Sequence, residues 1–149
     1  MLRVLAPLDA ATAEIVARIL GWLGIAAQRD LATLTDSSGF GYEIAFRCTG
    51  VIPAGLLAAA ILASGAPLAS RLPGAALGVL FIFVVNTIRL VTLFWIGVRF
   101  PSFFGVAHAA VWQGLMVCSV VGFFSYWKRC FSAVSAKGMA TQRMLVTSH

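Results

Sequence analysis

The sequence predicts an all-α integral membrane protein with about three transmembrane helices, an N-terminal amphipathic helix and a short outer β-hairpin. Apolar residues form 60% of the 149-residue chain, whereas soluble domains average about 45–50%. The mean hydropathy is +0.95, so the apolar surface is too large for the chain to bury in a core of its own. All five Asp and Glu residues precede Cys48, and no carboxylate side chain follows it.

An amphipathic helix that lies along the membrane interface is predicted within residues 1–30. Between Asp9 and Ala27, apolar residues recur at helical spacing, namely Ile15, Ile19, Leu20 and Leu23. Glu14 and Arg18 lie elsewhere around the same helix. Two charges inside the segment favour an interfacial helix over one that crosses the bilayer.

Residues 31–47 predict a β-hairpin on the outer face. Side chains alternate on both sides of the polar turn at 36–39, in the order Leu31, Thr33, Thr35 and then Phe40, Tyr42, Ile44, Phe46. A polar turn of Asp, Ser, Ser and Gly is typical of such a connection. The hairpin is therefore expected in water at the membrane surface, directly before Cys48.

Residues 48–127 predict a transmembrane core. Three apolar runs are long enough to span, at about 49–68, 75–98 and 103–127. We expect a short polar turn between the first two, because Arg71, Pro73 and Gly74 follow one another closely there.

Residues 128–149 predict a basic cytoplasmic tail. The tail contains four Lys and Arg residues, and the positive-inside rule places it on the cytoplasmic side together with Arg71, against Arg99 alone in the opposite loop. The net charge of +6 is then a consequence of topology. The basic residues form no stripe with interleaved aromatics, so we expect the lipid bilayer as a partner and no nucleic acid.

Three polar residues of the predicted core fall on the same side of the bilayer. Cys48 begins the first span at its outer end. Arg89 lies roughly 14 Å before the end of the second span, taking about 1.5 Å per residue. His108 lies within two turns of the start of the third span. An ionisable group inside a span is a candidate functional residue by default.

The chemistry that these residues support is acyl transfer. Carboxylate pairs, metalloprotease sites and Cys-His-Asp triads need acids that the spans lack, and we expect no metal and no cofactor. Cys48 would be the thiolate nucleophile, His108 the general acid and base, and Arg89 the cation that stabilises the thiolate or oxyanion. Asn86 would orient Arg89 or the substrate carbonyl. Cys118 and Cys130 are expected as small buried hydrophobic residues.

Two other classes of function compete with this hypothesis. In a non-catalytic membrane subunit or scaffold, the polar cluster would be structural, and small residues would mediate helix packing: Gly55, Ala58, Ala59, Gly74 and Gly78. A transporter or channel fragment is disfavoured, because one Arg and one His without an acid bind a cation poorly. Replacing Cys48 by alanine would separate an enzyme from a scaffold.

Three short motifs resemble the exosortase and archaeosortase family, and most closely the small exosortase H type. They are Cys48-Thr49-Gly50, then Asn86-Thr87-Ile88-Arg89, and then His108 followed by Trp112-Gln113-Gly114. Their order and their placement on successive spans make the set fairly specific. The resemblance covers roughly residues 10–125 of a chain that is shorter than the larger members.

The resemblance implies a cysteine transpeptidase or protease of the bacterial inner membrane, with several spans and an active site toward the periplasm. It would process C-terminal sorting signals of exported proteins, each made of a short motif, a transmembrane helix and a basic cluster. It would act through a thioacyl intermediate on Cys48, with Arg89 and His108 as the other catalytic residues. Asn86 and Gln113 are the candidate substrate-binding or orienting residues.

Overall fold

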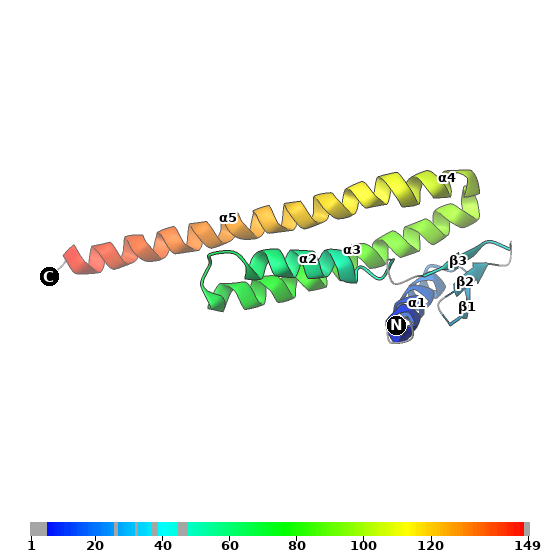
Figure 1. Cartoon of the computed structure of the whole chain (residues 1–149), viewed down its shortest axis with the longest axis horizontal. Coiled ribbons are helices and arrows are strands. Elements are labelled where there is room, and N and C mark those ends of the chain that lie inside the picture. Colours follow the sequence, from blue (N-terminus) through cyan, green and yellow to red (C-terminus); the bar gives the residue numbers. More distant parts are fainter. Residues whose placement is uncertain (1–5, 26, 32, 37–38, 45–47, 148–149) are drawn as a thin grey trace.

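The structure is a computed structural model that describes residues 6–25, 27–31, 33–36, 39–44 and 48–147. The fold is mostly helical, and a small sheet and the N-terminal helix lie together at one end of a long helical bundle (Figure 1). In chain order the elements are α1 (Ala6–Trp22), β1 (Ala27–Asp30), β2 (Thr33–Asp36), β3 (Gly41–Glu43), α2 (Val51–Leu62), α3 (Leu68–Arg99), α4 (Pro101–Val106), the π-helical segment η3 (Ala107–Val111) and α5 (Trp112–Thr147).

Within the described residues the predicted hairpin is confirmed as β2 and β3, which pair antiparallel with Leu34 opposite Tyr42. Phe46 and positions 37–38 of its predicted turn lie outside the described residues. A third strand, β1, was not predicted and pairs with the other side of β2. The predicted N-terminal helix is also present, and it packs against β1 and α3. One apolar core joins these elements, with contributions from Leu20, Leu34, Ile44 and Phe94.

Helix α1 buries a different set of apolar residues from the one that its spacing suggested. Ala13, Val16 and Leu20 are fully buried against the sheet and α3. Ile15 and Leu23 remain exposed. Of the residues that the spacing suggested, Leu20 thus lies in the core, whereas Ala13 and Val16 are buried in place of Ile15 and Leu23.

The first predicted span is a shorter helix than expected. Helix α2 has 12 residues, or about 18 Å at 1.5 Å per residue, against a hydrocarbon thickness of about 30 Å. Among the described residues, two helices are long and apolar enough to cross a membrane, Leu68–Arg99 and Pro101–Cys130. The expected count of about three full spans thus becomes two long helices and one short apolar helix.

The predicted polar turn at residues 71–74 is wrong, because α3 already begins at Leu68, directly after Pro67. Pro73 lies inside the helix but near its start, where it removes one backbone hydrogen bond. Gly74 has a packing role instead: a side chain there would collide with the ring of Trp127 on α5. The chain reverses at 63–67, a segment that contains Ser64 and Gly65.

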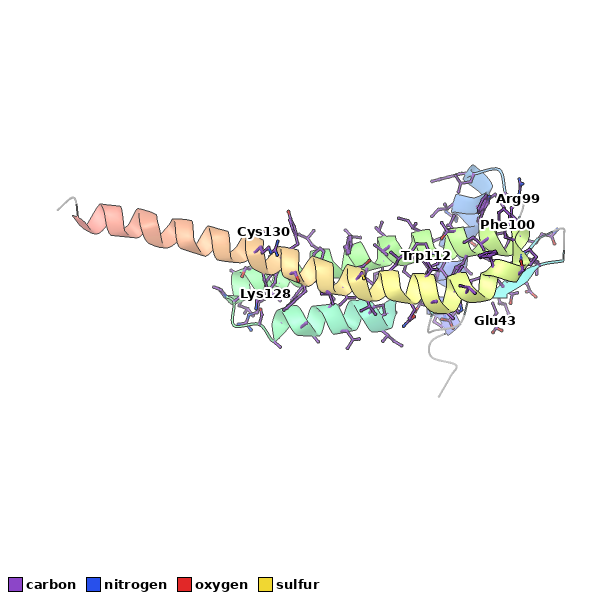
Figure 2. All side chains as sticks on the ribbon, turned by 90° about the horizontal axis from the view of Figure 1, so that it is seen from above. Glu43, Arg99, Phe100, Trp112, Lys128 and Cys130 are labelled. Atoms are coloured by element: carbon purple, nitrogen blue, oxygen red, sulfur yellow. The ribbon has the colours of Figure 1, made fainter. Side chains whose placement is uncertain are left out.

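The third predicted span is one helical run made of α4, η3 and α5 (Figure 1). The helix itself continues to Thr147, but its candidate membrane span ends at Cys130, close to the expected Trp127. A second apolar core joins α2, α3 and α5 through Leu57, Ile61, Ile82 and Met116. Many side chains project outward from the helices (Figure 2), and several apolar ones of α3 and α5 are exposed: Leu77, Leu80, Val84, Ile88 and Leu115.

Candidate functional site

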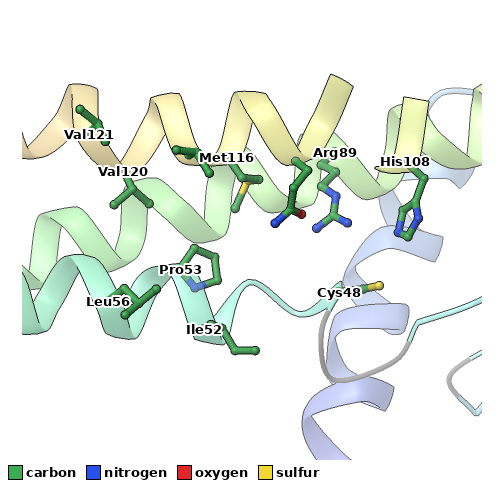
Figure 3. A pocket seen from close by; sticks show the side chains of 11 residues that line it. Cys48, Ile52, Pro53, Leu56, Arg89, His108, Met116, Val120 and Val121 are labelled. Atoms are coloured by element: carbon green, nitrogen blue, oxygen red, sulfur yellow. The ribbon is translucent and has the colours of Figure 1, made fainter. Parts of the chain in front are cut away.

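A cavity of about 660 Å³ lies between α2, α3 and α5. Cys48, Arg89 and His108 gather at its end nearest the sheet (Figure 3). Gln113 also lines the cavity, whereas Asn86 is not among the lining residues. The remaining wall is apolar and consists of Ile52, Pro53, Leu56, Met116, Val117, Val120 and Val121. The structure thus brings the three predicted catalytic residues to one cavity.

Cys48 reaches the cavity from the loop that precedes α2. Its side chain is buried, with 8% of its surface exposed. The Tyr42 hydroxyl donates a hydrogen bond to the Cys48 sulfur at 3.5 Å. Cys48 is free, as are Cys118 and Cys130. The expectation that the latter two are buried is wrong, because both lie on the outward face of α5 and are exposed.

Asn86 and Gly50 fix the backbone at Cys48. The Asn86 amide Nδ2 donates to the carbonyl oxygen of Cys48 at 2.7 Å. Asn86 therefore holds the loop of the cysteine, whereas the prediction was that it orients Arg89 or the substrate carbonyl. Gly50 has a positive φ of 79° and lies against this side chain, where a Cβ would come within 2.9 Å of Asn86. A glycine is required here both for the backbone conformation and for the close approach.

Gly50→Ala is expected to lower the stability of the fold by about 1–3 kcal/mol, because the substitution combines backbone strain with overpacking. The matched control is Gly55→Ala on α2, where an added Cβ meets nothing within 4 Å. Thermal unfolding in detergent, followed by circular dichroism, measures both variants. A melting temperature for Gly50→Ala equal to that of Gly55→Ala would contradict the packing.

Arg89 is a buried cation that has no partner charge among the residues that the structure describes. Only 6% of its surface is exposed, and its guanidinium faces the cavity (Figure 3). Its Nε has no hydrogen-bond partner among the described residues, and no salt bridge to Arg89 occurs within them. A desolvated charge that nothing neutralises is costly. The cavity therefore favours an anionic group beside Arg89, such as a thiolate or an oxyanion.

His108 lies in the π-helical segment, a local widening of the helix that occurs often at functional sites. Its ring stacks on Phe104, with centroids 5.8 Å apart and an interplanar angle of 1°. The ring of Tyr42 meets it edge-on at 6.2 Å. The buried Nε2 has no hydrogen-bond partner in the described part of the chain. Two aromatic neighbours thus orient the imidazole, and one ring nitrogen is left for proton transfer.

Tyr42 is a site residue that the sequence analysis treated only as a strand residue. Its side chain is 7% exposed. Burial raises the pKa of the Tyr42 hydroxyl above its ordinary value of 10, and the hydrogen bond to Cys48 raises it further. The hydroxyl therefore stays protonated near neutral pH and acts as a donor. One feature of the sequence could have indicated this role: Tyr42 carries a hydroxyl on the apolar face of a strand that ends shortly before Cys48.

No group of three metal-binding side chains occurs within the described ranges.

A family model for transmembrane exosortases matches residues 1–127. The match includes every residue that lines the cavity. A search of curated proteins and a search of solved structures give no match.

Proposed function

The chain belongs to the transmembrane exosortase family, and from this premise we propose that it is a membrane-embedded cysteine transpeptidase or protease. Its substrates are exported proteins that carry a C-terminal sorting signal. Such a signal combines a short motif, a transmembrane helix and a basic cluster. The observation that carries the proposal is the cavity shared by Cys48, Arg89 and His108.

In the first step, the Cys48 thiolate attacks the carbonyl carbon of the scissile peptide bond. Arg89 stabilises the negative charge that develops on the carbonyl oxygen. The carbon–nitrogen bond breaks, and His108 gives a proton to the departing amine. A thioester on Cys48 remains. Then water or an acceptor amine gives a proton to His108 and attacks the thioester, and the carbon–sulfur bond breaks to regenerate the thiolate.

The remaining cavity wall supports this choice of substrate. It is apolar and lies between α2 and α5, next to the nucleophile. The apolar segment that follows the cleavage motif fits such a wall, and Gln113 lies in the same lining to bind the peptide backbone. Asn86 acts on the substrate indirectly, since it holds the carbonyl of Cys48.

The proposed location is the bacterial inner membrane, with the cavity toward the periplasm. The sheet, Glu43 and Arg99 lie at one end of the molecule, and Lys128 lies toward the other (Figure 2). Arg71, near the start of α3, belongs to the end opposite the cavity. The basic C-terminal part of α5 extends beyond that same end (Figure 1). The positive-inside rule favours the cytoplasm for this end, which has Arg71, Lys128, Arg129, Lys137 and Arg143, against Arg18, Arg29 and Arg99 among the described residues of the other end.

One experiment tests the thioester and the orientation together. The chain is co-produced with an exported protein of the same organism that ends in an apolar helix and a basic cluster. We expect a covalent adduct on Cys48 that hydroxylamine releases, as thioesters require. Treating right-side-out vesicles beforehand with a membrane-impermeant maleimide should prevent the adduct. Absence of any adduct while the substrate is still cleaved would overturn the thioacyl mechanism, and an adduct that resists the maleimide would overturn the orientation.

A further inference from the structure

We propose that Tyr42 is a positioning residue for the nucleophile, and that its hydroxyl stabilises the Cys48 thiolate while its ring holds His108. The inference rests on the proposed function, since it assigns a role to a residue beside the proposed nucleophile. Tyr42 comes from the sheet, outside the three helices that form the cavity. The sheet therefore contributes directly to the reaction centre.

The hydroxyl contact is the first support. Tyr42 and Cys48 are both buried, and the hydroxyl lies 3.5 Å from the sulfur. A phenol is a stronger donor to sulfur when sulfur is negatively charged, because charge-assisted hydrogen bonds exceed neutral ones in strength. The contact therefore favours the thiolate over the thiol. It also restricts the rotation of the cysteine side chain.

The ring contacts are the second support. The Tyr42 ring meets Phe104 edge-on at 5.5 Å and His108 at 6.2 Å. Phe104 is itself stacked on His108. One side chain therefore touches the sulfur through its hydroxyl and the imidazole through its ring. This arrangement fixes the position of the nucleophile relative to the imidazole, the two groups that take part in acyl transfer.

The strand pairing explains why Tyr42 is rigid enough for this role. Tyr42 lies opposite Leu34 in the β2–β3 ladder. Phe40 lies two residues before Tyr42, just ahead of β3. Its ring packs edge-on against Phe94 and Phe104, and it fills the space beside Gly97 on α3, where a side chain would collide with it. Phe40, two residues before the tyrosine, thus anchors this part of the sheet to Phe94 on α3 and Phe104 on α4.

The described ionisable groups that contact Cys48 or line the same cavity come from three elements. Tyr42 on β3 supplies a neutral donor, Arg89 on α3 a positive charge, and His108 on η3 an imidazole. Arg89 brings a positive charge to the cavity that it shares with Cys48, whereas the tyrosine stabilises a thiolate through its hydroxyl without carrying charge. Removing its hydroxyl should therefore raise the pH at which the thiolate forms.

The test uses a chain in which Cys118→Ser and Cys130→Ser leave Cys48 as the only cysteine. Alkylation of the thiol by iodoacetamide is measured from pH 5 to pH 10 in detergent, without any substrate. Tyr42→Phe keeps the ring and removes the hydroxyl. We expect alkylation at neutral pH to slow roughly tenfold, and the pH of half-maximal alkylation to rise by about one unit. The plateau rate at high pH should not fall.

Tyr126→Phe is the matched control, because Tyr126 is an exposed tyrosine on α5, and its profile should equal that of the parent chain. A Tyr42→Phe profile that is unchanged, or that is lowered equally at every pH, would overturn the proposal. Tyr42→Leu removes the ring as well and is expected to slow substrate processing beyond the effect of Tyr42→Phe. Because alkylation needs no substrate, the alkylation profiles of Tyr42→Phe and Tyr126→Phe stand apart from the fate of the proposed enzymatic activity.

Discussion

Cys48→Ala is expected to abolish processing of tailed substrates, with a loss of at least about a thousandfold in the rate constant. Without the sulfur no thioester forms, and neither Arg89 nor His108 can replace it as a nucleophile. The substitution removes one atom from the edge of a cavity, so the fold should persist. The measurement is the fraction of uncleaved substrate that accumulates in cells producing the variant, together with the melting temperature of the purified chain.

Cys118→Ala and Cys130→Ala are the matched controls. Both cysteines are exposed on α5 and free, and both lie outside the cavity lining. Their replacement should leave processing within about twofold of the parent, since surface substitutions of this kind have small effects. Normal processing by Cys48→Ala would refute the enzyme and would favour a non-catalytic membrane subunit.

The sequence predicted the meeting of Cys48, Arg89 and His108 by depth alone. Helix rise is fixed at about 1.5 Å per residue, and consecutive apolar helices reverse direction. Counting residues from each turn therefore placed the three groups at one end. The predicted depth of Arg89 did not depend on the turn expected at 71–74, which was wrong. Arg89 was counted from the other end of its helix, and there the expected last residue, 98, differs little from the observed Arg99.

Other features depended on packing that a single sequence does not reveal. Helix α2 is short because the chain turns at 63–67. Arg71 and Pro73, which were expected in the turn, therefore lie inside α3. Pro73 is the sixth residue of α3, where a proline removes one backbone hydrogen bond without ending this helix. The apolar periodicity was therefore a better guide to this helix than the turn residues were.

The periodicity of apolar residues also does not predict contacts between residues that are far apart in the sequence. Asn86 was expected to act on Arg89 because the two lie one helical turn apart, yet its amide binds the carbonyl of Cys48, 38 positions earlier. Tyr42 lies on the apolar face of the predicted hairpin, but nothing in the alternation pattern indicates that its hydroxyl reaches sulfur. Both contacts follow from how the loop at 48–50 folds over α3.

Arg89→Lys is expected to lower the rate constant of processing by about 100- to 1,000-fold, the usual effect of losing one donor to a developing oxyanion. Lysine keeps the charge but replaces the planar fork of the guanidinium by a single ammonium on a flexible stem. Arg99→Lys is the matched control, because Arg99 is the exposed last residue of α3. Single-turnover cleavage of the purified substrate measures both variants.

The Arg89→Met variant distinguishes a catalytic role of Arg89 from a structural one. A buried guanidinium with no ion pair in the described ranges is a cost to the fold, and an apolar side chain of similar length removes that cost. If Arg89 acts on the reaction, the variant should lose processing while its melting temperature stays level or rises. If Arg89 instead holds the bundle together, as the scaffold hypothesis requires, the melting temperature should drop, and the proposed catalytic role would fail. The opposite signs make stability the deciding measurement.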